Sequence, residues 1–188
     1  MRKIIALTVL LISSSNYAQK RVQFGPMISF NTANVFTVGY VGDQTGTTFN
    51  FGGFIRANLK DFYGQAELGY GANKFSIADS DFTNTDYKLA GTDFSLMIGL
   101  KLIPFGKIGD ARILGGYNGK YYSSIQPGTG SNGFEVHKYN NSVVVGGGVD
   151  LWKLTLDFRY LIGITDIDDS TNMAKTQAFN ASLGYKFQ

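Results

Sequence analysis

Apolar and polar residues alternate along this chain in short stretches. The clearest stretch is Gly91–Leu102, whose apolar positions are Phe94, Leu96, Ile98, Leu100 and Leu102. A period of two predicts a β-strand with one apolar face and one polar or small face. The same alternation predicts seven further strands, near Arg21–Phe30, Thr47–Leu59, Phe62–Ala72, 112–118, Ser142–Leu151, 154–162 and Gln177–Gln188.

The connections between these strands alternate in length. Lys60-Asp61 and Trp152-Lys153 are tight turns, and Ile103–Asp110 is a short connection. The other connections are long and rich in Gly, Asn, Asp, Ser and Thr: Asn31–Gly46, Asn73–Ala90, Ser123–Asn141 and Thr165–Lys175. Short turns on one side and long loops on the other are typical of outer-membrane barrels. The sequence therefore predicts an all-β fold, an eight-stranded antiparallel up-and-down transmembrane β-barrel.

A soluble barrel of the lipocalin kind would show the same alternation with its apolar face inside. Two observations favour the membrane barrel. The polar faces carry mostly Gly, Ser, Asn and Thr, which suits a narrow interior better than a solvated outer wall. Aromatic residues also lie near strand ends, as in the girdles at membrane interfaces. These predicted interface aromatics are Phe49, Phe62, Tyr70, Trp152, Tyr185 and Phe187.

The first 18 residues have the order of a secretory signal peptide. Arg2 and Lys3 precede an apolar run over 4–12, and small or polar residues lead to Ala18. This order predicts cleavage after Ala18 and a mature barrel domain over 19–188. Removal of the signal takes away two of the 17 basic residues and leaves 15 against 14 acidic ones, so a nucleic-acid partner has no support. The chain has no cysteine, which excludes a lipoprotein and a disulfide-stapled domain.

The 24 glycines are close to twice the usual share of about 7%. Glycine weakens ordinary strands, so the excess needs a reason. A narrow barrel supplies one, because small inward residues make room for large neighbours.

The charged residues of the polar faces are predicted to form a network in the lumen: Arg56, Glu67, Asp93, Lys101, Arg112, Asp150, Asp157, Arg159 and Lys186. A two-residue turn pairs Arg56 with Gln65 and places Glu67 on the diagonal. Buried charges need partners. An ion path or proton relay would use such residues. The interior of an eight-stranded barrel is barely wide enough for side chains, which favours a plug instead.

Three other groups of residues are candidates for chemistry. His137, with Glu135, Ser131 and Ser142, could perform acyl transfer as in outer-membrane lipid A-modifying enzymes, although a solvated loop histidine is favoured. Asp166, Asp168 and Asp169 could bind Ca²⁺ but lack the spacing of a calcium loop. Gly146–Gly148 precedes no helix and is not a phosphate loop. The sequence predicts no catalytic residue, cofactor or metal.

The first long connection keeps the apolar run Val35–Val41. Val and aromatic residues favour extended structure, and Gly42–Gly46 supplies a turn. We therefore expect a protruding hairpin in which Val35, Phe36, Val38 and Tyr40 offer a free strand edge to a protein partner. The alternative is that this run folds over the barrel mouth.

The last strand ends at Tyr185 and Phe187, and it resembles the closing strand of outer-membrane barrels, which the barrel-insertion machinery reads. Strand 154–162 contains Leu156-Asp157-Phe158-Arg159-Tyr160 and is followed by Gly163-Ile164-Thr165-Asp166. Together with Gly184-Tyr185-Lys186-Phe187, these residues resemble the PorT-like outer-membrane barrels of Bacteroidota, a family that includes a component associated with type IX secretion. The resemblance implies contact with outer-membrane lipid or lipopolysaccharide. We expect a non-enzymatic barrel with a structural or interaction role through its extracellular loops; the alternatives are a lipid A-modifying enzyme, a small pore and a secretion-system accessory protein.

Overall fold

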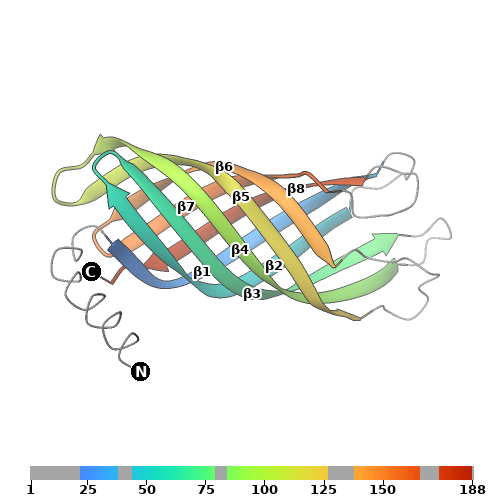
Figure 1. Ribbon diagram of the computed structural model, residues 1–188. Coiled ribbons are helices and arrows are strands. Elements are labelled where there is room, and N and C mark those ends of the chain that lie inside the picture. The colour runs from blue at the N-terminus through green and yellow to red at the C-terminus, as the bar shows by residue number, and fades with distance from the viewer. Residues whose placement is uncertain (1–21, 38–43, 79–83, 127–137, 166–173, 188) are drawn as a thin grey trace, which may run out of the picture.

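The computed structural model describes residues 22–37, 44–78, 84–126, 138–165 and 174–187. Eight antiparallel strands form one closed barrel in chain order, with β1 paired to β8 (Figure 1). The strands are β1 (Val22–Thr37), β2 (Gln44–Leu59), β3 (Phe62–Ala78), β4 (Asn84–Pro104), β5 (Gly109–Gln126), β6 (Tyr139–Leu151), β7 (Leu154–Gly163) and β8 (Ala174–Tyr185). The predicted fold class is confirmed.

The two tight turns lie where they were predicted. The β2–β3 turn at residues 60–61 and the β6–β7 turn at residues 152–153 each contain one non-glycine residue with positive φ, at 56° for Lys60 and 55° for Trp152. The β4–β5 turn, at 105–108, uses Gly106 with φ of 67°. These turns gather at one end of the barrel, where β1 begins and β8 ends (Figure 1).

Two of the four predicted long connections are in large part strand. For residues 73–90, between β3 and β4, this corrects the expected loop, and for residues 31–46, between β1 and β2, an extended hairpin was expected. Pairing between β3 and β4 continues to Ala78 and Asn84, inside the segment expected to be a loop. Pairing between β1 and β2 reaches Val35 and Gln44, as expected for a hairpin in this connection. The strands continue past the end of their apolar outer face because the backbone hydrogen-bond ladder does not require one.

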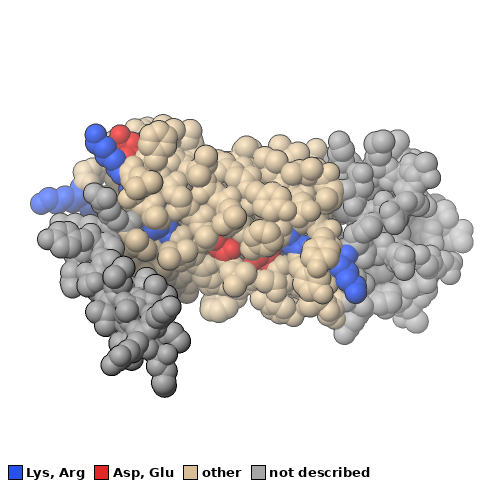
Figure 2. Space-filling model, viewed as in Figure 1, with Lys and Arg blue, Asp and Glu red and all other residues tan. Residues whose placement is uncertain are grey.

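The apolar face points outward and the polar face inward. Ile98 is 76% exposed on the outer wall, whereas Arg56 is fully buried in the lumen. Most of the described surface in Figure 2 is uncharged, with basic side chains at its two ends and a few charged atoms along one line between them. In the described ranges, no helix has the length and apolar character needed to cross a bilayer.

Inward glycines relieve crowding in the lumen. A Cβ on Gly99 would lie 2.2 Å from the Tyr63 ring, and a Cβ on Gly148 would lie 1.9 Å from Asp157 Oδ1. Real side chains do not approach this closely. Large polar residues fill the space that these glycines leave, which is the reason expected for the glycine excess in a narrow barrel.

Candidate functional site

Asp150 on β6 lies at the centre of a first group of lumenal charges. Its Oδ2 is 2.6 Å from Arg56 Nη1 on β2 and 3.1 Å from Lys186 Nζ, just after β8. Its Oδ1 is 3.2 Å from Arg112 Nε on β5. Three cations therefore converge on one carboxylate near the end of the barrel that carries the short turns.

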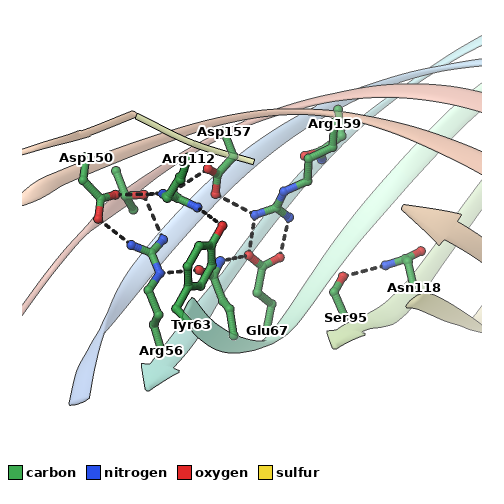
Figure 3. Close-up of polar contacts among 12 residues, drawn as sticks. Arg56, Tyr63, Glu67, Ser95, Arg112, Asn118, Asp150, Asp157 and Arg159 are labelled. Carbon is green, nitrogen blue, oxygen red and sulfur yellow. Dashed lines mark hydrogen bonds and ion pairs between the residues drawn. The ribbon is translucent and has the colours of Figure 1, made fainter. Parts of the chain in front are cut away.

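Arg159 on β7 organises a second group. It donates two hydrogen bonds to Glu67 on β3, at 2.6 and 2.5 Å, and one to Asp157, at 2.8 Å. Arg112 Nη2 lies 2.5 Å from the other oxygen of Asp157 and so joins the two groups. Figure 3 shows these side chains converging from β2, β3, β5, β6 and β7.

Neutral side chains complete the network. Gln65 accepts a hydrogen bond from Arg56 Nε and donates one to Glu67 Oε1, both at 2.5 Å. The Tyr63 ring lies between two guanidinium carbons, 5.1 Å from that of Arg56 and 5.3 Å from that of Arg112. Its hydroxyl also accepts a hydrogen bond of 2.9 Å from Arg112. Thr155 Oγ1 accepts hydrogen bonds from both of these arginines.

Almost all of this charge is removed from solvent. The side chains of Arg56 and Arg112 have no exposed area, and those of their carboxylate partners are at most 4% exposed. Removing charges from water costs several kcal/mol per ion, and the cost is offset only when the remaining donors and acceptors are hydrogen-bonded. The bidentate and bridging contacts above provide most of that compensation, although Arg159 Nε has no hydrogen-bond partner among the described residues.

Two predicted members of the network lie apart from it. Lys101 Nζ is 3.7 Å from Asp110 Oδ2, and both side chains are partly exposed. Asp93 lies opposite Lys120 in the β4–β5 pair. Within the described part of the chain, Asp93 Oδ2 has no hydrogen-bond partner. The other seven predicted residues are connected by the contacts already given.

A cavity of about 100 Å³ lies on the long-hairpin side of the Glu67–Arg159 pair. It is large enough for about three water molecules at roughly 30 Å³ each. Asn50, Asp93 and Asn180 line it, and each has a side-chain oxygen without a hydrogen-bond partner among the described residues. Polar and apolar side chains both line this space, and the unpartnered oxygens of Asn50, Asp93 and Asn180 give bound water hydrogen-bond partners there.

The lumen also contains an apolar cluster that was not predicted from the sequence. Tyr63, Met97, Leu114 and Val144 are buried together, and Leu161 packs against them. All five occupy inward positions of strands whose inward face was expected to be polar. The available signal was that Met97, Leu114 and Val144 interrupt the polar face in three successive strands.

The residues considered for catalysis and calcium binding lie largely outside the described residues. These are Ser131, Glu135, His137, Asp166, Asp168 and Asp169. Ser142 is described and is buried in the lumen wall, where it lines the 100 Å³ cavity. Among the described residues, no three His, Cys, Asp or Glu side chains are grouped to hold a metal ion.

The expected free edge of β1 is wrong where the structure describes it. β8 pairs with β1 as far as Thr37, with Val35 opposite Thr176 and Phe36 opposite Lys175. β2 pairs with the other side of β1 up to Val35. The error arose because β8 begins earlier than the alternation indicated. Val38 and Tyr40 lie outside the described residues.

The predicted interface aromatics are all exposed on the outer wall: Phe49, Phe62, Tyr70, Trp152, Tyr185 and Phe187. Phe187 also holds the end of the chain against β1. Its backbone N–H donates a 2.7 Å hydrogen bond to Phe24 O, and its ring lies 5.8 Å from that of Phe24 and 5.2 Å from that of Tyr185. The last aromatic residues therefore hold the closing strand against β1.

Residues 4–187 match the family described as the outer membrane protein beta-barrel domain. The chain belongs to this family. Its membership agrees with the closed barrel, the apolar outer wall and the charged lumen, and it makes the protein an outer-membrane β-barrel. No curated protein matches the sequence.

Several solved outer-membrane proteins have similar structures. Neisserial surface protein A is 14% identical with a TM-score of 0.56, and the match covers 87% of this chain and 97% of that one. Ail of Yersinia pestis is 13% identical with a TM-score of 0.46, over 89% of this chain and 99% of that one. LpxR from Salmonella typhimurium is 8% identical with a TM-score of 0.35, over 95% and 93%. At these identities the first likeness shows the fold alone, and the other two carry no argument.

Proposed function

We propose that this outer-membrane barrel does not conduct ions and that it has a structural or interaction role through its extracellular hairpins. The observation that carries the proposal is the network that joins Arg56, Asp150, Arg112, Asp157, Arg159 and Glu67 from wall to wall. An eight-stranded barrel has an interior just wide enough for side chains. An ion would have to separate pairs that lie about 2.5–3.2 Å apart. Separating one buried pair costs about 3–5 kcal/mol.

The lengths of the strands support a role on the extracellular side of the membrane. β4 has 21 residues. At about 3.3 Å per residue and a tilt of about 40°, it rises roughly 50 Å, twice the apolar band of about 25 Å. β3 and β5 have 17 and 18 residues and pair with β4 over much of its length. A hydrogen-bonded sheet thus extends well beyond the band and could present hairpins to a partner or to lipopolysaccharide.

Further assignments rest on sequence resemblance. From the residues of β7 and of the chain end, we propose that the protein is one of the PorT-like barrels of Bacteroidota. The first 18 residues would direct export through the inner membrane of a Gram-negative cell, and the terminal aromatic strand would be read by the barrel-insertion machinery.

Recordings in planar bilayers test the absence of conduction. We expect no steady single-channel current from the wild type or from Arg159→Ala, because the Arg56–Asp150–Arg112 group remains in the variant. Steady current from the wild type would overturn the proposal.

A pull-down from outer membranes tests the interaction role. The wild type is compared with a variant in which residues 38–43 and 79–83 are replaced by Gly and Ser, and with the control Lys153→Gln in the short β6–β7 turn. A partner identified by mass spectrometry that is lost only in the hairpin variant supports the role. Identical recovery from all three proteins contradicts it.

A further inference from the structure

The lipid-facing wall of the barrel contains a hollow of about 580 Å³ over β2 to β5. Its floor is made of small residues: Ala57, Gly64, Ala66 and Gly115. Three of these lie in one cross-strand row, with Gly64 opposite Ala57 on one side and Ile98 on the other, and with Ile98 opposite Gly115. Ile98 projects from the middle of this row and lines the hollow.

Crowding in the barrel does not explain why glycine stands at positions 64 and 115. A Cβ built on Gly64 meets no atom within 4 Å, and one on Gly115 would lie 3.6 Å from the nearest atom, Val144 O. In the lumen, by contrast, a Cβ on Gly99 would clash with Tyr63. Glycine in a strand is destabilising relative to alanine. Gly64 therefore keeps open a space on the outer surface that the fold itself does not require.

A second hollow, of about 560 Å³, adjoins the first. It shares Ile55 and Ala66 with it and continues over Pro26 and Gly53 on β1 and β2. Both hollows are lined largely by apolar side chains and lie in the wall that faces the hydrocarbon of the bilayer. The two adjacent apolar hollows, which share Ile55 and Ala66, suit the two acyl chains of one phospholipid.

The β2–β3 turn supplies polar groups at the end of the hollows. Lys60 and Asp61 are exposed neighbours in this turn. Lys60 is three residues beyond Ala57, or about 10 Å along the strand at roughly 3.3 Å per residue. The Lys101 backbone N–H donates a 2.8 Å hydrogen bond to Asp61 O and fixes the turn against β4. A cation and an anion side by side are complementary to a head group that carries a phosphate and a primary ammonium.

We propose that the two hollows bind the acyl chains of a phospholipid of the periplasmic leaflet, with its phosphate at Lys60 and its primary ammonium at Asp61. The site is continuous with the lipid-facing wall that the family assigns to the membrane. The placement of the short turns on the periplasmic side follows the general arrangement of outer-membrane barrels.

Native mass spectrometry of the full barrel in detergent tests the site. The probes are phosphatidylethanolamine, phosphatidylcholine and phosphatidylglycerol with identical acyl chains. We expect one retained lipid, with phosphatidylethanolamine preferred up to about fivefold, as about 1 kcal/mol for an exposed ion pair allows. Asp61→Asn should remove this preference, since it takes away the acceptor of the primary ammonium. Lys60→Gln should lower retention of all three lipids.

Gly64→Leu should abolish retention, because it fills the first hollow. The space around Gly64 allows this variant to fold, which heat-modifiable gel mobility checks. Ala181→Leu on the outer wall of β8 and Lys153→Gln in the β6–β7 turn are matched controls and should retain lipid as the wild type does. Equal retention of the three lipids, or retention that survives Gly64→Leu, would overturn the proposal. A protein dimer that is lost in Gly64→Leu would instead assign the hollow to a second copy.

Discussion

Arg159→Ala tests how much the lumenal network contributes to stability. The substitution removes both hydrogen bonds to Glu67 and the one to Asp157. The two carboxylates are left in different situations. Asp157 keeps Arg112 Nη2 at 2.5 Å, whereas Glu67 keeps only the hydrogen bond from Gln65. Glu67 is 8% exposed, so it becomes a buried carboxylate without a cation.

Removing one partner of a buried pair typically costs about 3–5 kcal/mol. Because Asp157 retains a cation and the 100 Å³ cavity beside Glu67 can supply water, we expect a loss near the lower limit, about 3 kcal/mol. The double variant Arg159→Ala/Glu67→Gln should recover at least half of this loss, since it removes the stranded charge. Recovery by the second substitution separates the charge effect from the loss of packing.

Urea unfolding in lipid vesicles measures both values. Trp152 is the only tryptophan, lies in the β6–β7 turn and is 82% exposed, so its fluorescence reports on folding from outside the network. Glu67→Gln alone serves as the control. A loss below about 1 kcal/mol for Arg159→Ala, or a double variant no more stable than the single one, would refute the assignment of stability to this ion pair.

Three further predictions concern the lipid-facing wall, the glycines and the predicted signal peptide. Ile98→Arg places a charge on the lipid face and should destabilise the barrel in urea unfolding by up to about 2–4 kcal/mol, the cost at the bilayer midplane; stability equal to that of the wild type would contradict the outward face. Gly99→Ala should destabilise by about 1–3 kcal/mol because its Cβ meets Tyr63, while Gly64→Ala, the matched control with free space, should stabilise by about 0.4–1 kcal/mol. N-terminal sequencing of protein from outer membranes should begin at Gln19; a start at Met1 would exclude the predicted signal.

The number of strands, their faces and the tight turns could be predicted because lipid on one side and a narrow lumen on the other impose a period of two. The strand ends could not. β3 and β4 remain paired at Ser76–Asp86 and Ala78–Asn84, where Ser76, Asp86 and Asn84 occupy register positions that carry apolar residues nearer the short turns. The apolar Phe75 and Ile77 take the alternate positions, so the alternation changes phase and one continuous apolar face ends there. The same limit produced the incorrect free edge on β1.

The lumenal contacts could be predicted between neighbouring strands only. A two-residue turn sets the register of its hairpin, so the pairing of Arg56 with Gln65 and of Arg159 with Gly146 follows from the sequence. The contact between Arg56 and Asp150 crosses the lumen from β2 to β6. It depends on the tilt and stagger with which the barrel closes, and these are properties of all eight strands together.

The glycines show why residue type alone cannot assign a role on such a barrel. Gly99 and Gly64 occur in neighbouring strands, yet Gly99 faces the lumen and Gly64 faces the lipid. At Gly99 the Tyr63 ring occupies the space that a side chain would need, and this ring lies against two arginines. The packing of the lumen therefore requires glycine at this position. At Gly64 the space stays open toward the bilayer, so its occupant must come from outside the chain. Substitution by alanine should therefore have opposite signs at the two positions, and that difference in sign distinguishes a packing requirement from a binding surface.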